Sequence, residues 1–376
     1  MPSTFPIWID DPINAAILAV SEDRLQGFQL DPFGEVAERS GVDVATVLER
    51  IVAMLRAGTI RRVRQTLMAT NLAEGSLCAW QVPPEKLNDA FDWLSQVDPF
   101  SGHVVIRTTD AATPGSNYRL WTTLKVPQGY DIAAYAAFLA ARVGAEAYRL
   151  MPAKALFALG VGHVRRRGME PGARADVLAE VKDTEIVSLD EREWHVLTAI
   201  KREFAPEEIV RDVWRERAAQ AGLSLEEFAR IGNELNAKKV IGRFSTFLEH
   251  VKPSAAAGGA SVTRYNALFH WKVPVGREID AGREVGRHYI MTHAYWREGG
   301  PEFRGVNIMG VAHGTEKETV LAHKAAIDQH LREAGIDFDY TNVFWGGRSE
   351  IKPSEIAPDA FRDFCRAQGI DPETMR

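Results

Sequence analysis

The stretches SLCAWQVPP at residues 76–84 and NALFHWKVP at residues 266–274 are apolar runs that both pass through Trp and Val to Pro. Two further pairs of segments occur in the same order along the chain: TIRRV (59–63) with VIGRF (240–244), and YRLWTTLKV (118–126) with VNIMGVAHG (306–314). Matching segments in matching order indicate an internal repeat of long period. We therefore expect a divergent tandem duplication of one module.

Each copy of the module is expected to begin with helices. Between residues 31 and 60, apolar residues recur at steps of three and four, with a turn at residues 40–43 and a stop at Gly58. LDEREWHVLTAIKREF (189–204), a helix near 210–221 and LSLEEFARIGNELNAKKVI (223–241) repeat this pattern. Both parts are typical of helix-turn-helix units.

Strand-like runs follow the helices in both copies, with a helix after the second and fourth runs. The order reads βαββαβ with one additional early strand, which is typical of a ferredoxin-like sheet covered by two helices. We therefore predict an α+β fold, a tandem duplication of a winged-helix or helix-turn-helix unit plus a ferredoxin-like unit. The expected parts are a helix-turn-helix unit at 10–60, a ferredoxin-like unit at 61–168, a linker at 169–187, a second pair of units at 188–240 and 241–352, and a C-terminal helical tail at 353–376.

Composition excludes several classes of protein. A net charge of −6 argues against a general polyanion binder, because affinity for nucleic-acid backbones comes from clustered Lys and Arg. The two cysteines, Cys78 and Cys365, have no metal-binding spacing and no disulfide framework. The N-terminus carries two Asp where an export signal would be basic, and its apolar run is too short to span a bilayer. We expect a cytoplasmic protein without a membrane segment.

Histidines on predicted strands are the first candidates for chemistry: His163, His250, His270, His293 and His313. Alternation along the strand THAYWRE places His293, Tyr295 and Arg297 on one face. Imidazole can bind iron or transfer a proton near neutral pH, Tyr can donate a proton, and Arg can hold a carboxylate. The ordinary alternative for each of these side chains is a solvated or satisfied sheet face.

Arginines cluster at predicted strand ends, in IRRVRQ (60–65), in HVRRRG (163–168) and at Arg243 and Arg264. Solvated strand ends account for most such runs. Recognition of a small ligand with several carboxylates is the alternative, and it suits an acidic protein better than nucleic acid does. No glycine-rich phosphate loop, GxSxG elbow or HExxH zinc motif occurs in the sequence.

Helix-turn-helix units also suggest DNA binding, which requires Arg, Lys, Asn or Gln on the recognition helix. The candidate recognition helices, 43–57 and 223–236, balance their few arginines with acidic residues. DNA binding is therefore not expected, although a ligand-sensing regulator stays open as an alternative because fold alone does not determine function.

The two kinds of unit in tandem resemble the Lrp/AsnC regulators, and particular segments resemble the siroheme decarboxylases, which are enzymes related to those regulators. GFQLDPFGEVAERSGVDVATVLERIVAMLRAGTIRRV (27–63) is similar to the N-terminal helical region of that family. VIGRFSTFLEH, NALFHWKVP, THAYWRE and VNIMGVAHG are similar to its strands. Family members are two-part assemblies, sometimes fused in one chain, so the resemblance implies a pseudo-dimer within this chain. A further homodimer is left open.

The resemblance also implies site residues in the second copy. His250 matches the His of the family's RH-type element, with Glu249 in place of the Arg. Arg297 matches the Arg after the Tyr-containing strand, and Asn307 and His313 match the YNL…HG element. The implied catalytic residues are His250, His293, Tyr295 and Arg297, with His250 or His293 as ligand of the tetrapyrrole iron.

The first copy departs from the family pattern. Arg107 and Tyr118 stand at the corresponding spacing, but Arg119 replaces Asn and Lys125 replaces His. The first copy is thus expected to be a degenerate or supporting site. The implied substrate-binding residues of both copies are Arg243, Arg264, Asn307, His313, Arg107, Tyr118 and Arg119.

The chemistry implied by the resemblance is the loss of acetate carboxyl groups from siroheme as CO₂, without a separate redox cofactor, in heme or heme d1 biosynthesis. Arginines would orient the other carboxylates while a nearby acid protonates the carbon. A tetrapyrrole-binding relative without decarboxylase activity and an Lrp/AsnC-type regulator are the alternatives.

Overall fold

The computed structural model describes residues 5–158, 169–181, 186–249, 264–352 and 354–376. The chain divides into two compact units. Unit 1 draws on Met1–Ala69 and Val187–Thr263, and unit 2 on Thr70–Gly160, Met169–Ile186 and Arg264–Arg376. The units therefore cut across the boundaries expected from sequence order, because each one combines equivalent parts of both copies.

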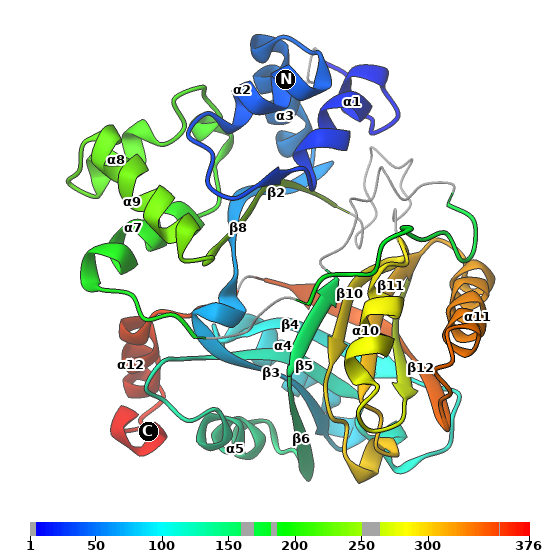
Figure 1. Cartoon of the computed structure of the whole chain (residues 1–376). Coiled ribbons are helices and arrows are strands. Elements are labelled where there is room, and N and C mark those ends of the chain that lie inside the picture. The colour runs from blue at the N-terminus through cyan, green and yellow to red at the C-terminus, as the bar shows by residue number, and fades with distance from the viewer. Residues whose placement is uncertain (1–4, 159–168, 182–185, 250–263, 353) are drawn as a thin grey trace. The chain divides into compact units, whose positions relative to one another are not determined.

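Unit 1 contains the two helical parts and the early strand of each copy (Figure 1). The strands pair antiparallel in the order β1-β8-β2, so the early strands of the two copies are partners in one sheet. This pairing explains why both strands separate from the ferredoxin-like segments to which the sequence assigned them. The elements are α1 (Pro12–Ser21), β1 (Leu25–Gln26), α2 (Pro32–Ser40), α3 (Val44–Arg56), β2 (Ile60–Leu67), α7 (Glu191–Lys201), α8 (Arg215–Gln220), α9 (Leu225–Ala237) and β8 (Ile241–Leu248).

Local chemistry sets the helix ends in the first helical part. The Asp31 carboxylate accepts a hydrogen bond from the Gly34 amide at 2.9 Å, and Pro32 occupies the first helical position of α2. Gly41 ends that helix with φ 72°, in the left-handed region that favours glycine. Asp43 then caps α3 through the Thr46 amide at 3.0 Å. These caps confirm the turn expected at residues 40–43.

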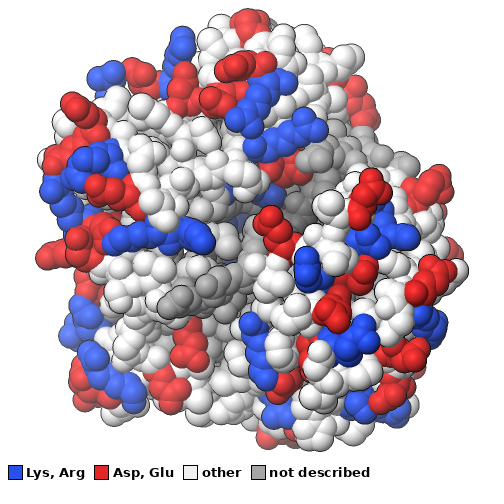
Figure 2. All heavy atoms as spheres, viewed as in Figure 1, with Lys and Arg blue, Asp and Glu red and all other residues white. Residues whose placement is uncertain are grey.

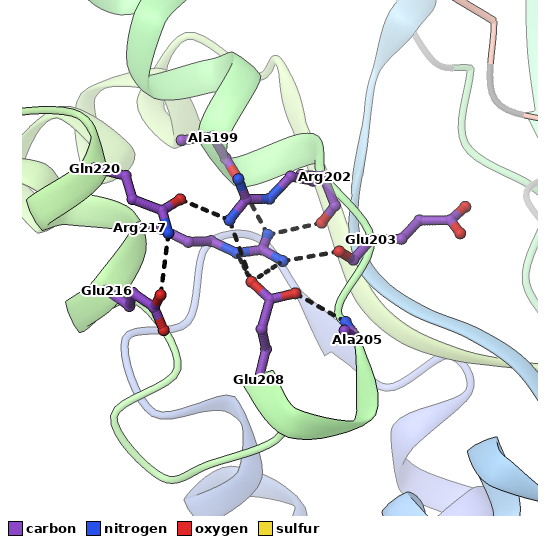
Figure 3. A network of polar contacts seen from close by, with 8 residues as sticks. All are labelled: Ala199, Arg202, Glu203, Ala205, Glu208, Glu216, Arg217 and Gln220. Atoms are coloured by element: carbon purple, nitrogen blue, oxygen red, sulfur yellow. Dashed lines mark hydrogen bonds and ion pairs between the residues drawn. The ribbon is translucent and has the colours of Figure 1, made fainter.

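The second helical part is held by one buried arginine (Figure 3). The Arg217 guanidinium donates to the carbonyl oxygens of Ala199 at 3.1 Å, Arg202 at 2.7 Å and Glu203 at 2.9 Å, where α7 ends. It also pairs with the Glu208 carboxylate at 3.2 Å. The last carbonyls of a helix have no partner within the helix, so this side chain replaces a backbone cap. The helix expected near 210–221 is shorter in the structure, where α8 covers only Arg215–Gln220.

Unit 2 contains two copies of the same four-stranded arrangement. The first copy has the strand order β6-β3-β5-β4 and the second has β12-β9-β11-β10, which are equivalent orders of the pattern βαββαβ. This topology confirms the predicted α+β class and its ferredoxin-like units. The first copy comprises β3 (Ala73–Gln81), α4 (Leu87–Gln96), β4 (Ser101–Thr108), β5 (Leu120–Pro127), α5 (Ile132–Val143) and β6 (Ala147–Pro152). The second comprises β9 (Tyr265–Lys272), α10 (Glu278–Gly286), β10 (Met291–Trp296), β11 (Ile308–Gly314), α11 (Lys317–Glu333) and β12 (Tyr340–Ile351).

The two copies in unit 2 share one nine-stranded sheet. β12 pairs with β9 and, further along, with β4 of the first copy. In the same way β6 pairs with β3, and β7 (Ala155–Ala158), which follows after two residues, pairs with β10 of the second copy. The sheet thus begins at β6 and ends at β7, and the chain joins these two edges directly. Strands of the two copies therefore pair with each other in two places, β12 with β4 and β7 with β10. We call these two places the seams.

Three clusters of buried apolar residues pack against this sheet. Helices α4 and α5 and the C-terminal helix α12 (Pro358–Ala367) cover the first copy, and α10 and α11 cover the second (Figure 1). The third cluster lies between the copies and combines strand residues from both with Phe303 from a short helical turn; it includes Trp121, Met151, Leu268, Met309 and Phe344. The faces that α4, α5, α10 and α11 leave uncovered thus face one another, and the candidate site lies on them.

The segment expected to be the linker packs on unit 2 in its described part. The Ala175 amide donates to the Arg287 carbonyl at 3.0 Å, and the Arg283 guanidinium donates to the Ala179 carbonyl at 3.0 Å. Arg283 belongs to α10, and Arg287 is the residue that caps the C-terminus of this helix. Within the described ranges, no helix is long and apolar enough to cross a membrane.

Candidate functional site

The strand β10 carries the constellation predicted from sequence. The rings of His293 and Tyr295 are stacked, with centroids 5.9 Å apart and an angle of 7° between the planes. The Arg297 guanidinium carbon lies 4.3 Å from the centroid of the Tyr295 ring. These contacts confirm that the three side chains share one face, as strand alternation requires. Burial raises the pKa of Tyr295, while the positive charge of Arg297 opposes that rise.

Arg297 connects this strand to the first copy. Its guanidinium donates a short hydrogen bond to the carbonyl oxygen of Met151 on β6. Its charge also acts on Lys125 of β5, whose side chain lies over Gly75 of the neighbouring strand β3, where a β-carbon would collide with the Lys125 ammonium. Desolvation, followed by the charge of Arg297, lowers the pKa of Lys125 to about 7. The face with His293 and Tyr295 is thus completed by a lysine from the other copy.

A buried positive charge normally pairs with a carboxylate, because desolvation of an isolated ion is costly. Arg297 is 8% exposed, and within the described ranges no Asp or Glu forms an ion pair with it or with Lys125. The site therefore holds two neighbouring cations without an internal counter-ion. Such an arrangement suits a ligand that brings its own negative charges.

A second cationic site lies at the equivalent position of the other seam. Arg107 on β4 donates to the Phe344 carbonyl at 3.5 Å, just as Arg297 donates to the Met151 carbonyl. Phe344 and Met151 are equivalent, since they pair with Leu268 and Leu77 on the first strand of each copy. Desolvation lowers the pKa of Arg107 to about 9. Here the guanidinium also contacts the Asn266 side-chain oxygen at 3.3 Å.

The two seams carry different side chains at equivalent places. His313 pairs in register with Asn266, as Lys125 pairs with Gly75. The Arg107 seam therefore has Asn266 and His313, whereas the Arg297 seam has Gly75 and Lys125. Because each seam combines both copies, the expectation of one working copy and one supporting copy does not describe the geometry: His313 belongs with the arginine of the first copy.

His270 lies near Arg107 and is buried among aromatic rings. Its ring centroid is 5.0 Å from that of Phe344 and 6.1 Å from that of Trp121. Burial and then the charge of Arg107 lower its pKa to about 3, so this imidazole is neutral at physiological pH. Sequence reasoning noticed His270 as a strand histidine but did not place it in the site.

Other predicted site residues lie elsewhere in unit 2. The Asn307 amide nitrogen donates to the Val273 carbonyl at 2.9 Å and to Glu278 at 3.2 Å, and its oxygen accepts from the Val273 amide at 2.8 Å. These bonds tie β9 to α10 and favour a structural role for Asn307 over direct ligand contact. Tyr118 packs on Phe303 with centroids 5.4 Å apart, and Arg119 is half-buried just before β5, where its carbonyl accepts from the Arg107 amide.

The remaining predicted residues are Arg243, Arg264 and His250. Arg243 belongs to β8 of unit 1, where desolvation lowers its pKa and the charges of Asp23 and Glu22 act against that shift. Arg264 is exposed immediately before β9, and its amide donates to the Gly314 carbonyl at 3.0 Å. His250, like His163 and the run at 165–167, lies outside the described residues. Arg243 thus has acidic neighbours that the seam cations lack.

Lys125 and Asn266 are the residues that sequence reasoning did not select. Lys125 was noticed only as a replacement for a histidine, yet it stands in the apolar strand YRLWTTLKV. A lysine within such a strand is the signal that could have found it, because lysine is among the residues that are mostly exposed in folded proteins. Asn266 carries no comparable signal, since its partner Arg107 comes from the other copy.

Comparison with known proteins agrees with this geometry. A family profile described as an AsnC-like ligand binding domain matches residues 72–158, which run from the start of β3 to the end of β7. The siroheme decarboxylase beta subunit of Desulfovibrio desulfuricans (strain ATCC 27774 / DSM 6949 / MB) is 27% identical over 115 residues, covering 30% of this chain and 70% of that protein. Part of this chain is thus similar in sequence to a siroheme decarboxylase subunit.

Two crystal structures of the siroheme decarboxylase NirDL share the fold of nearly the whole chain. One gives a TM-score of 0.65 at 18% identity and covers 96% of this chain and 100% of that chain. The other is a complex with an iron-uroporphyrin III analogue and gives 0.64 at 18% identity, covering 95% and 99%. At this identity the likeness shows a common fold.

Proposed function

We propose that this protein binds an iron tetrapyrrole of the siroheme type and removes acetate carboxyl groups from it as CO₂. The observation that carries this proposal is the pair of cations, the buried Arg297 and the half-buried Lys125, beside the stacked rings of Tyr295 and His293. The related proteins support the choice of ligand, because they include siroheme decarboxylases and a complex with an iron-uroporphyrin III analogue.

A tetrapyrrole with carboxylates on its rim suits the charges of the two seams. Arg297 and Arg107 are both buried and lack an acidic partner among the described residues, and their planar guanidinium groups can each hold a carboxylate by two hydrogen bonds. Bound carboxylates would offset the cost of burying these charges. The ligand would thus supply counter-ions that these two arginines do not find among the described residues.

Decarboxylation requires an oriented carboxylate and a proton donor. When the carbon–carbon bond to the carboxylate breaks, CO₂ leaves and the electron pair stays on the methylene carbon, which must then take up a proton to become a methyl group. Tyr295 and His293 are the candidate proton donors, and Arg297 holds Tyr295 in place through its contact with the ring. His293 is also a candidate ligand of the substrate's iron, a role it shares with His250.

Anaerobic incubation with siroheme, followed by mass analysis of the macrocycle, tests the proposal. We expect products that have lost CO₂, and a Soret band that changes when the protein binds siroheme. Binding without mass loss would leave a tetrapyrrole-binding relative that is not a decarboxylase. If His293→Ala and His250→Ala both keep binding and turnover unchanged, the chemistry lies elsewhere in the chain.

A ligand-sensing regulator is the second candidate, favoured by the helix-turn-helix parts and the AsnC-like match. The basic side chains of the candidate recognition helices are engaged, however: Arg50 bonds to Asp11 at 3.3 Å and Arg56 pairs with Glu207 at 3.1 Å. On the face that Figure 2 shows, Lys and Arg alternate with Asp and Glu and do not form one basic area. A gel-shift assay with upstream DNA at stated salt would favour the regulator if specific binding appeared.

A further inference from the structure

We propose that Lys125 is an anion-binding residue that completes the Arg297 site across the seam between the two copies, and that it takes up a proton when a substrate carboxylate binds. This inference rests on the proposed function, because the anion is a carboxylate of the tetrapyrrole. It adds a residue that departs from the family pattern, and it assigns that residue to the site built on the other copy.

The position of Lys125 supports a role in binding. Its strand neighbour Gly75 has no side chain, and the lysine occupies the space that a β-carbon would fill. The equivalent place on the other seam holds Asn266, whose side-chain oxygen engages Arg107. Arg297 has no asparagine in the equivalent place; its neutral neighbour is Tyr295 of its own copy, and the group that stands nearby from the other copy is a second cation.

Two neighbouring cations repel one another, so the arrangement is unfavourable unless a third group separates them. Among the described residues, the charge that acts on Lys125 is that of Arg297, which in turn contacts Tyr295. β3 adds no charge on this face, because it presents Gly75. A carboxylate bound between Lys125 and Arg297 would supply the missing negative charge.

Proton uptake follows from the same surroundings. Before the ligand binds, burial and the charge of Arg297 favour the neutral amine, and the pKa of Lys125 is about 7. A bound carboxylate favours the ammonium form and raises that pKa again. At alkaline pH, binding must therefore include protonation of Lys125, and affinity must fall as pH rises above neutrality.

Equilibrium titration of the full chain with iron-free uroporphyrin III between pH 7 and 9 tests this inference. The porphyrin carboxylates stay ionised over this range, because ordinary carboxyl pKa values lie near 4. For the wild type we expect the Kd to rise about tenfold or more from pH 7 to 9, since each unit above the pKa of the free lysine reduces the ammonium fraction about tenfold. Lys125→Arg should bind with little dependence on pH, because guanidinium stays protonated.

Lys125→Met should bind weakly at every pH, with a Kd at least about tenfold above that of the wild type at pH 7. It should unfold at the same temperature as the wild type or higher, because it removes a cation that has no partner in the free protein. Lys272→Met is the matched control, since Lys272 is half-buried like Lys125 but pairs with Asp339 at 3.2 Å. The control should keep the affinity and the pH dependence of the wild type.

The outcomes separate this inference from the proposed function. Wild-type binding that is constant from pH 7 to 9, or Lys125→Met that binds like the wild type, would overturn the role of Lys125 and leave tetrapyrrole binding in place. If the wild type binds neither uroporphyrin III nor siroheme, the proposed function fails and this inference fails with it.

Discussion

At the scale of single residues, the site depends on a short stack of side chains on one strand. Tyr295 has His293 on one side and the Arg297 guanidinium near its ring. A cation near an aromatic ring is attracted by the electron-rich face, and a buried ring keeps its neighbours in one orientation. The stacking depends on the ring of Tyr295 and not on its hydroxyl.

Tyr295→Phe separates the chemistry from the packing. The ring and its contacts with the His293 ring and the Arg297 guanidinium remain, while the proton donor and its hydrogen bond with Arg297 are lost. We expect turnover of siroheme to fall by about 10²-fold or more while the Kd stays close to that of the wild type. Single-turnover mass analysis measures the first quantity and absorbance titration the second.

Tyr289→Phe is the control for this change, because Tyr289 follows α10 and its amide bonds to the Ala173 carbonyl at 3.1 Å, away from the stack. It should turn over at the wild-type rate. Full activity of Tyr295→Phe would assign proton donation to another group.

At the scale of elements, buried polar side chains determine where several helices end. Arg217 is 1% exposed and bonds to three carbonyl oxygens at the end of α7 and to Glu208 (Figure 3). Desolvation lowers its pKa to about 10, so it stays charged at neutral pH. This one side chain joins α7, α8 and the turn between them.

Arg217→Met should destabilise the second helical part by about 3 kcal/mol, because Glu208 and the helix-end carbonyls lose a buried partner. Hydrogen exchange of the α7 and α9 amides measures this local stability. Arg230→Met, which removes an exposed pair with Glu234 on α9, should change it by less than about 0.5 kcal/mol. Equal protection in both variants would contradict the role given to Arg217.

A pair of histidines connects the C-terminal end of α10, the helix α11 and the segment 169–181. The His288 ring bonds to the His330 ring at 2.8 Å, and the Arg174 and His288 backbones form an isolated bridge. Burial, followed by the charge of His330, lowers the pKa of His288 to about 3. The unfolded chain therefore binds a proton below about pH 6.5 that the folded chain does not bind.

Stability should consequently fall as pH decreases from about 6.5, by up to about 1.4 kcal/mol per pH unit for His288 alone. His288→Asn, which keeps a polar group but cannot titrate, should lose less stability between pH 7 and 5 than the wild type. Thermal unfolding midpoints of both proteins over this range test the prediction. The loss due to His270 is common to both, so parallel curves would contradict the role of His288.

At the scale of the whole molecule, each compact unit is formed by exchange between the two copies. In unit 2 this exchange depends on β7, a strand of the first copy that pairs with β10 of the second. Phe157 of β7 packs against Gly282 and Gly286 of α10, leaving no room for a β-carbon at Gly282. The glycine is thus required by the strand from the other copy.

The sign of the stability change caused by Gly282→Ala tests this dependence. Alanine favours an exposed helix over glycine by about 1 kcal/mol, so stabilisation is expected if Phe157 does not matter. We expect instead a loss of about 1–3 kcal/mol from overpacking. In combination with Phe157→Ala the two changes should cost less than their sum, by about 0.5–3 kcal/mol in urea unfolding. Additive effects would contradict the packing of β7 on α10.

Much of the architecture was predictable because it depends on local patterns. Paired segments revealed the duplication, and the order of strands and helices indicated the ferredoxin-like units. Boundaries between units were not predictable in the same way, since β2 and β8 are strands in either arrangement and only their mutual pairing places them in unit 1.

The sequence by itself determined the shared face of His293, Tyr295 and Arg297, because strand alternation is a property of the local backbone. Tertiary structure alone decided what faces them. Whether Arg297 meets Lys125 or His313 depends on which sheet edges pair, and edge pairing is set by long-range contacts between the copies. Tertiary structure also binds the side-chain amide of Asn307 to Val273 and Glu278 of its own copy, and it assigns Arg243 to the other unit. A cation without a counter-ion becomes visible only when all its neighbours are in place.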